Sequence, residues 1–383
     1  MKTPVYLDYA ATTPVDSRVI EAMLPWLGDR FGNPSSSHAF GRDAARALDV
    51  AAGQVADLIG ATPDEIVWTS GATEANNLGI FGVARAAREG RRHLITLATE
   101  HRAVLDPVAQ LVREGFEATV LGVNGDGLVD PDAFRAAVRP DTLLASVMLV
   151  NNEIGVIQRI DELAAIARER GALFHCDAAQ APGKLPIDVR ALDVDLMTLT
   201  AHKTCGPKGI GALYVRSKPR VPLAAQLVGG GQQHGRRSGT LPVHQIVGIG
   251  EAFRIAGEEG AAEAARVRVL RDALCERLRA IGGVHVNGSL EHRVAHNLNI
   301  SVERAGGEAL IAALPDLAIS TGSACSAAHA EPSHVIRALG RSVELADASL
   351  RITLGRWTTA EETAFAAERI GTAIAALRSG LYQ

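Results

Sequence analysis

Between residues 60 and 215 the chain alternates short apolar, β-rich runs with stretches of helical periodicity. The predicted strands are EIVWTS (65–70), HLITLA (93–98), ATVLG (118–122), LLASVMLV (143–150), ALFHC (172–176), DLMTLT (195–200) and IGALYV (210–215). Several runs are apolar throughout, as expected for strands that are buried on both faces of a mostly parallel sheet. In a stretch between two runs, Leu163, Ile166 and Ala167 share one helical face. The pattern therefore predicts an α/β fold.

The pattern changes after about residue 220. A glycine-rich segment (227–240) precedes a long helical pattern over about 243–281, and the later strand signals are few: VHV (284–286), LNIS (298–301) and SLRITLG (349–355). The last helix begins at Thr359, which forms a capping-box pattern with Glu362. We expect two domains: a large α/β domain over residues 15–254, and a smaller α+β domain built from residues 1–14 and 255–383.

Composition excludes several classes of protein. The 383 residues carry a formal net charge of −4 and no basic stripe, which argues against a nucleic-acid partner. The four cysteines form no CxxC pair, which is typical of a reducing compartment. The N-terminal residues lack an apolar leader, and no apolar run is long enough to cross a bilayer. We expect a soluble cytoplasmic protein with no membrane partner.

Polar residues directly follow several predicted strands, where open α/β sheets bind their ligands. They are Gly71-Ala72-Thr73, Glu100-His101, Asn151-Asn152-Glu153, Asp177 with Gln180, and Ala201-His202-Lys203. The first of these opens a predicted helix, and the free N–H groups of a helix N-terminus bind anions. The set therefore combines an anion cradle with an imidazole, a carboxylate, an amide and an amine.

This combination suits pyridoxal phosphate. A lysine amine such as that of Lys203 can bind the aldehyde covalently, and an aspartate keeps the ring nitrogen protonated so that the ring acts as an electron sink. Each residue alone has an ordinary alternative: Asp177 as a helix N-cap, His101 as a surface or core histidine, and Gly71 as part of a plain turn. The hypothesis rests on their common place at strand ends.

Several motifs of the chain resemble those of cysteine desulfurases, of the class-V aminotransferase family. They are Tyr6-Leu7-Asp8-Tyr9-Ala10-Ala11-Thr12-Thr13, Gly32-Asn33-Pro34-Ser35-Ser36-x-His38, Ser70-Gly71-Ala72-Thr73-Glu74-Ala75-Asn76-Asn77, Glu100-His101, Asn151-Asn152-Glu153-Ile154-Gly155, Asp177-Ala-Ala-Gln180, His202-Lys203, Gly206-Pro207-Lys208-Gly209-Ile210-Gly211, Arg237-Ser238-Gly239-Thr240 and Thr321-Gly322-Ser323-Ala324-Cys325. The resemblance runs from residue 6 to about 357. The resemblance is specific because it rests on many separate motifs and not on a single one.

The resemblance implies a pyridoxal-phosphate enzyme of the aspartate-aminotransferase fold (fold type I), usually a homodimer. It implies that the enzyme removes sulfur from L-cysteine, giving L-alanine and an enzyme-bound persulfide. The implied phosphate ligands are Ala72, Thr73, Thr200 and His202, with Thr240 contributed across the dimer interface. His101 would stack on the ring, Asn152 and Gln180 would contact it, Asp177 would pair with its nitrogen, and Lys203 would bind the cofactor covalently. The implied catalytic residues are Cys325, Lys203 and His101.

Cys325 would accept the sulfur. Small residues surround it, as in an accessible loop, although cysteines are more often buried and inert. The TGSAC match favours the acceptor role. The long stretch from Cys325 to Ser333 resembles the desulfurases that serve iron–sulfur cluster assembly, which implies a sulfur-acceptor protein such as an iron–sulfur scaffold as partner. Arg351 would bind the substrate carboxylate together with Asn152; a structural salt bridge is its alternative role.

Other hypotheses remain open at this point. Within the same fold, the chain could be a selenocysteine lyase or an aminotransferase, although an aminotransferase does not need a thiol that reaches into the site. A non-catalytic scaffold of the same fold is a further alternative. No four-ligand metal set emerges from the histidines and cysteines, so we expect no metal. Cys205 departs from the family pattern and receives no role. The sulfur acceptor and the pathway (cluster assembly, nitrogenase maturation or tRNA thiolation) stay undetermined.

Overall fold

The structure, a computed structural model, describes residues 2–87, 90–321 and 332–380. Within these ranges no helix is long and apolar enough to span a membrane. The strands are β1 (Val5–Tyr6), β2 (Ile66–Thr69), β3 (His93–Leu97), β4 (Glu117–Leu121), β5 (Thr142–Met148), β6 (Leu173–Asp177), β7 (Leu196–Thr200), β8 (Gly211–Val215), β9 (Val284–Val286), β10 (Asn297–Val302), β11 (Leu317–Ala318) and β12 (Ser349–Thr353). The predicted sheet strands are thus confirmed to within two residues.

The α-helices are α1 (Ser17–Met23), α2 (Ala39–Ile59), α3 (Ala72–Ala86), α4 (Arg102–Arg113), α5 (Pro131–Ala137), α6 (Ile160–Glu169), α7 (Val243–Arg279), α8 (Gly307–Ala312), α9 (His334–Ala338), α10 (Val343–Asp347) and α11 (Ala360–Arg378). Three short 3-10 helices join them: η1 (Leu24–Leu27), η2 (Pro63–Glu65) and η3 (Gln233–Gly235). The predicted capping box is present, because the hydroxyl of Thr359 accepts from the N–H of Glu362, whose carboxylate accepts from the N–H of Thr359.

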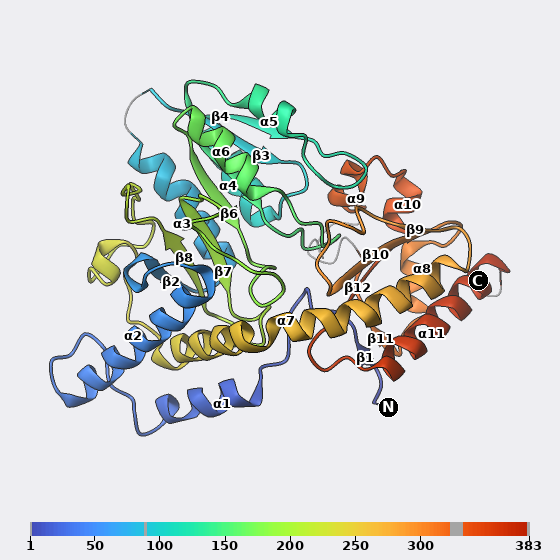
Figure 1. The fold of residues 1–383 in the computed structure, drawn as a ribbon, viewed down its shortest axis with the longest axis horizontal. Helices are drawn as coiled ribbons and strands as arrows, with labels where there is room; N and C mark the ends of the chain where they lie inside the picture. The colour runs from blue at the N-terminus through green and yellow to red at the C-terminus, as the bar shows by residue number, and fades with distance from the viewer. Residues whose placement is uncertain (1, 88–89, 322–331, 381–383) are drawn as a thin grey trace.

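Seven strands form one large sheet in the order β2-β8-β7-β6-β5-β3-β4. β8 runs antiparallel to both of its neighbours, and the other neighbouring pairs are parallel. Helices α3 and α4 pack on one face, while α2, α6 and the first half of α7 pack on the other (Figure 1). Because helices cover both faces, alternate residues of one strand enter different clusters: Tyr214 of β8 faces α2 and α7, and Leu213 faces α3. The α/β expectation is confirmed.

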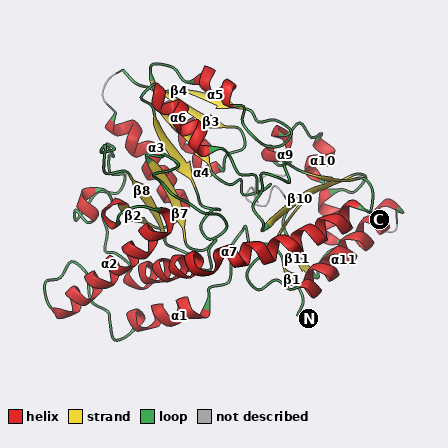
Figure 2. Cartoon of the chain, in the orientation of Figure 1, coloured by secondary structure: helices red, strands yellow, loops and turns green. Residues whose placement is uncertain are grey.

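A second, smaller sheet has the order β12-β10-β9 and is antiparallel, and β1 pairs with β11 in parallel. The second half of α7 and helix α11 pack on it, forming a separate apolar cluster that also contains Val5 and Leu7. Figure 2 shows the two groups of strands on either side of the molecule, with α7 running along both. The predicted domain boundary at residues 254 and 255 falls inside α7, whose buried contacts change from the first cluster to the second between Ile255 and Val267.

Candidate active site

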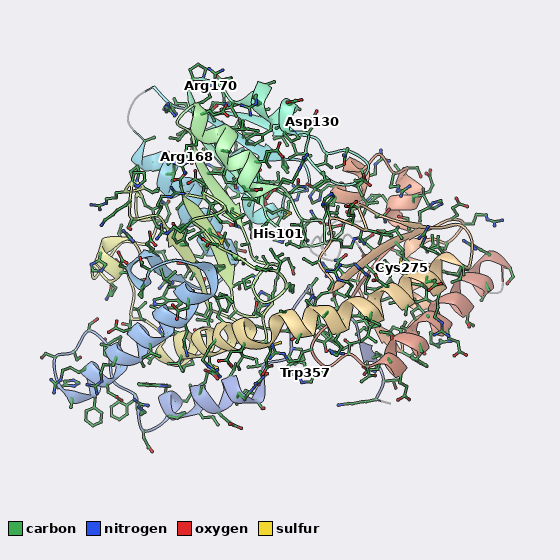
Figure 3. All side chains as sticks on the ribbon, viewed as in Figure 1. His101, Asp130, Arg168, Arg170, Cys275 and Trp357 are labelled. Carbon is green, nitrogen blue, oxygen red and sulfur yellow. The ribbon has the colours of Figure 1, made fainter. Side chains whose placement is uncertain are left out.

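A cavity of about 600 Å³ opens at the carboxyl ends of the central parallel strands. β5, β6 and β7 end at Met148, Asp177 and Thr200, and all three residues line it. The sequence-predicted residues that line this cavity are Ala72, Thr73, His101, Asn152, Asp177, Gln180, Thr200, His202, Lys203 and Arg351. The fold therefore brings together residues as far apart in the chain as Ala72 and Arg351. Figure 3 shows His101 near the centre of the molecule, between the two groups of strands.

The anion cradle forms where β2 turns into α3. Gly71 precedes the helix with a φ of 150°, a conformation that favours glycine, and its Cα hydrogen points toward Thr200, whose Oγ1 lies 4.0 Å from where a Cβ would stand. Helix α3 therefore begins close to the end of β7. Oγ1 of Thr200 is buried and has no partner within the described part of the chain. This hydroxyl and the N–H groups of the first turn of α3 can bind a phosphate.

Asp177 ends β6 and is buried. Its Oδ2 accepts a hydrogen bond from Nδ2 of Asn76 at 2.7 Å, and its Oδ1 accepts from the N–H of Ala179 at 2.9 Å. The carboxylate is thereby held in one orientation at the cavity wall. Such a carboxylate can pair with a protonated ring nitrogen.

His101 caps the N-terminus of α4. Its Nδ1 accepts a hydrogen bond from the N–H of Ala103 at 3.0 Å. Burial lowers the pKa of the ring, so the imidazole is neutral near pH 7 and carries its proton on Nε2. A neutral, fixed imidazole at the cavity wall can stack on a flat aromatic ring.

Lys203 lies half-buried in the loop that follows β7. Its neighbour His202 contacts Oγ1 of Thr12 through Nδ1 at 3.1 Å, and the carbonyl of His202 accepts from the N–H of Thr13 at 2.8 Å. Burial and the nearby lysines lower the pKa of His202 to about 4, which keeps it neutral. The loop is therefore held against the N-terminal segment, and this contact fixes the backbone that carries the Lys203 amine.

Gln180 and Asn152 supply amides to the cavity. Nε2 of Gln180 donates to the carbonyl of Ala10 at 2.9 Å, and its Oε1 accepts from Nζ of Lys184 at 2.9 Å. Oδ1 of Asn152 is buried and unpartnered among the described residues. Asn152 thus has a free acceptor at the cavity, whereas Gln180 is fixed at both ends of its amide.

Arg351 lies on β12 and is 2% exposed. Its Nη2 donates to Oδ1 of Asp8 at 2.9 Å, and its Nη1 donates to the carbonyl of Asn152 at 3.1 Å. The Nε proton has no acceptor among the described residues. The structural salt bridge is therefore present, but the guanidinium also lines the cavity and keeps a donor to offer a carboxylate.

Two of the sequence-predicted residues lie elsewhere. Thr240 is exposed and does not line the cavity of its own chain. Cys325 lies outside the described residues, but described residues on both sides of its segment bond to neighbours of two cavity-lining residues, Arg351 and Asn152. Oγ of Ser320 donates to Oδ2 of Asp8 at 2.7 Å, and Oγ of Ser333 donates to the carboxylate of Glu153, next to Asn152 in the chain.

The residues present fit pyridoxal phosphate. Oγ1 of Thr200 and Oδ1 of Asn152 are buried polar atoms without partners, and such atoms cost free energy unless a bound group satisfies them. The helix N-terminus suits the phosphate, Asp177 suits the ring nitrogen, and Lys203 suits the aldehyde. By contrast, no group of three His, Cys, Asp or Glu side chains in the described ranges is arranged to hold a metal ion.

Sequence reasoning assigned no role to three residues that support the site: Asp8, Asn76 and Lys184. Asn76 lies four residues after Ala72, so it stands one helical turn above the cradle. That spacing could have revealed it. Asp8 and Lys184 hold Arg351 and Gln180 through contacts that no local pattern predicts.

The sequence matches the class-V aminotransferase family over residues 5–364. It is 60% identical over 379 residues to the cysteine desulfurase IscS of Methylococcus capsulatus, covering 99% of this chain and 94% of the relative. It is 58% identical over 379 residues to the protein of the same name from Neisseria meningitidis serogroup C, with the same coverage.

The comparison with solved structures supports the same family. A NifS-like protein superposes with a TM-score of 0.91 at 34% identity, covering 97% of this chain and 99% of that one. The structure described as SspA in complex with cysteine superposes with a TM-score of 0.81 at 38% identity, covering 92% and 99%. The fold is therefore the type I fold of pyridoxal-phosphate enzymes, as expected. The chain belongs to the pyridoxal-phosphate-dependent cysteine desulfurases of the class-V aminotransferase family.

Proposed function

We propose that this protein removes sulfur from L-cysteine, releases L-alanine and carries the sulfur as a persulfide on Cys325. The observation that carries the proposal is the convergence of the cofactor-type residues and Arg351 on one cavity. Ser320 and Ser333, on either side of the segment that contains Cys325, bond to Asp8, the partner of Arg351, and to Glu153, which follows Asn152 in the chain. The relatives named cysteine desulfurase IscS support the same activity.

In this proposal Ala72, Thr73, Thr200 and His202 bind the phosphate of the cofactor. When bound, pyridoxal phosphate supplies an electron sink for the substrate carbon atoms. Asp177 holds the ring nitrogen protonated, and Asn152 and Gln180 contact the ring. His101 stacks on it, and its Nε2–H is its one donor because Nδ1 is already bonded to the backbone.

The remaining residues act on the substrate. Arg351 pairs with the α-carboxylate of L-cysteine through its free donor, and Asn152 orients the bound substrate. The amine of Lys203 holds the cofactor covalently and moves a proton at Nζ. The thiolate of Cys325 attacks the substrate sulfur: the new S–S bond forms, the Cβ–S bond breaks, and its electron pair stays with the carbon, which takes up a proton. One cysteine and one thiol therefore give one alanine and one persulfide.

The decisive experiment incubates the purified protein with L-cysteine and a reductant and measures alanine and sulfide together. We expect equal amounts of both. Cys325→Ser should keep the yellow colour of bound cofactor and lose both products, because a hydroxyl cannot replace the thiolate. In the wild type, mass spectrometry should find one additional sulfur on the peptide that contains Cys325, removable by reductant. Full activity of Cys325→Ser, with no cysteine gaining sulfur, would refute the proposal.

We further propose a cytoplasmic homodimer in which Thr240 of the second copy completes the phosphate site, and a sulfur-acceptor protein such as an iron–sulfur scaffold as partner. The exposed position of Thr240 supports the dimer. So do exposed apolar side chains around the start of α2, where Phe31 is 73% exposed and stacks on Phe40, which is 55% exposed. Sedimentation would test the dimer, and Thr240→Ala should weaken cofactor binding without changing the oligomeric state.

A further inference from the structure

An ion pair joins the cofactor cradle to the glycine-rich segment 227–240. Nε of Arg237 donates to Oε1 of Glu74 at 2.8 Å, and its Nη2 donates to Oε2 at 3.2 Å. The N–H of Ser70 also donates to Oε2 of Glu74, at 2.7 Å. The two side chains of the pair are about four-fifths buried, at 17% and 20% exposed. This is a bidentate, shielded pair, unlike most surface ion pairs of the chain.

Glu74 occupies an unfavourable place for a carboxylate if the cavity takes a phosphate. It lies in the first turn of α3, two residues after Ala72, and it lines the same cavity as Ala72 and Thr73. Two like charges in a shielded site repel each other strongly. Burial raises the pKa of Glu74, but the hydrogen bonds from Arg237 and Ser70 outweigh burial and leave the pKa below its usual value. The carboxylate is therefore ionised at neutral pH, beside an anion site.

Arg237 does not line the cavity, so it faces Glu74 rather than the space that a ligand would fill. The segment that carries it is held in place independently. The side-chain amide of Gln233 donates to the carbonyl of Trp68 at 2.9 Å and accepts from its N–H at 2.6 Å, pairing with the outer edge of β2. The segment that carries Arg237 is thus fixed to the edge of the large sheet, and this places Arg237 against Glu74.

We propose that Arg237 is a positioning residue for cofactor binding, which neutralises the Glu74 carboxylate so that the cradle accepts the cofactor phosphate. The inference rests on the proposed placement of that phosphate at Ala72 and Thr73. It goes beyond the phosphate ligands themselves, because Arg237 acts through Glu74 and not on the phosphate.

The test is a double-mutant cycle of Glu74 and Arg237 on the holoenzyme. Equilibrium dialysis of each variant, with retained cofactor read from its visible absorbance, gives the dissociation constant for pyridoxal phosphate. Arg237→Gln leaves the carboxylate uncompensated and should weaken binding about tenfold or more, the effect of a single close charge in a shielded site. Glu74→Gln should bind as tightly as the wild type or more tightly. The double variant Glu74→Gln with Arg237→Gln should regain most of the lost affinity.

Binding of a second ligand, pyridoxal, distinguishes an effect of charge on the phosphate from a change in the shape of the site. Pyridoxal, which lacks the phosphate, should bind Arg237→Gln and the wild type equally. Arg236→Gln is the matched control: it removes the neighbouring arginine, whose Nη1 donates to the carbonyl of Asp64, and should change neither constant. Arg237→Lys keeps the charge and should retain most of the affinity even if the bidentate geometry is lost.

Three outcomes would overturn the inference. If Arg237→Gln and Glu74→Gln lose the same affinity and the double variant regains none, the pair is a structural clamp and its charge plays no part. If Arg237→Gln weakens pyridoxal as much as pyridoxal phosphate, the effect does not act through the phosphate. If Arg237→Gln binds normally, Arg237 has no role in the cradle. Failure of the wild type to bind pyridoxal phosphate would instead refute the proposed function. The melting temperature of each cofactor-free variant reports whether it is folded.

Discussion

The amide of Asn76 donates a hydrogen bond to the carboxylate of Asp177 at 2.7 Å. Asn76 belongs to α3, whose first turn is proposed to bind the cofactor phosphate, and Asp177 ends β6. The contact ties the cradle to the residue proposed to pair with the ring nitrogen. One helix, α3, would therefore position both the phosphate and the ring nitrogen of a bound cofactor.

Asp177→Asn should lower turnover by several orders of magnitude while the cofactor stays bound, because the charge that keeps the ring nitrogen protonated is gone. Asn76→Ala keeps that charge and removes one donor, so its turnover should fall only about tenfold, the effect of one hydrogen bond to a charged group. Steady-state alanine release and the visible spectrum check both. Equal losses in the two variants would contradict the proposed role of Asp177.

Lys203→Ala should abolish covalent attachment of the cofactor. Borohydride reduction of the wild type should fix the cofactor on the peptide that contains Lys203, and peptide mass spectrometry measures this directly. Lys208→Ala, five residues further along the same loop, is the control and should still be labelled at Lys203. Labelling of any other lysine in the wild type would show that the cofactor lysine is misassigned.

Cys205 should not carry the sulfur, although it lies only two residues after Lys203. It is buried, and burial raises the pKa of its thiol to about 11, so the nucleophilic thiolate is scarce at neutral pH. Cys205→Ala should therefore desulfurate L-cysteine at nearly the wild-type rate. An additional sulfur found by mass spectrometry on Cys205 of the wild type would contradict this.

Arg351→Gln should raise the KM for L-cysteine by about 10- to 100-fold, because a charge-assisted hydrogen bond to the α-carboxylate is lost. Cofactor absorbance should not change, since Arg351 is assigned to the substrate and not to the cofactor. Arg341→Gln is a control on an arginine that contacts Asn287 and Val286 instead. An unchanged KM in Arg351→Gln would assign Arg351 to structure alone, through its ion pair with Asp8.

Glu65 makes the stability of the large sheet depend on pH. Burial raises the pKa of Glu65, but hydrogen bonds from Ser217, Thr62 and Arg190 outweigh burial and lower the pKa to about 2. The pKa in the unfolded chain is about 4.3, so the ionised group stabilises the fold above that pH, and the contribution is lost as the pH falls toward 2.

Glu65→Gln should therefore lower the free energy of unfolding by about 1–3 kcal/mol at pH 7, with a smaller difference from the wild type at pH 3. Urea unfolding at the two pH values measures both differences. A difference that stays constant between pH 7 and pH 3 would mean that packing around Glu65, rather than its charge, carries the effect.

The local pattern of the sequence was sufficient for the large sheet. The apolar runs are long enough to be recognised, and those inside the sheet are buried on both faces, so runs such as 143–150 coincide with strands; the edge strand β4 is partly exposed. It also placed the cofactor-type residues that follow strands in one cavity, because the carboxyl ends of parallel strands meet at one edge of a sheet. β1 and β11, of two residues each, were not predicted, since such short strands show no periodicity and exist only because Val5 pairs with Leu317.

The sequence by itself thus determined the fold class, the placement of the candidate residues at strand ends and the family. Only the tertiary structure decided how the functional side chains are held, because those contacts join residues that are distant in the chain. Asp8 meets Arg351 across 343 positions, and Glu74 meets Arg237 across 163. Charge pairs of this kind depend on the packing of two separate elements, which no local period encodes. For this reason the sequence could name candidate residues that meet in one cavity, but not the partners that orient them.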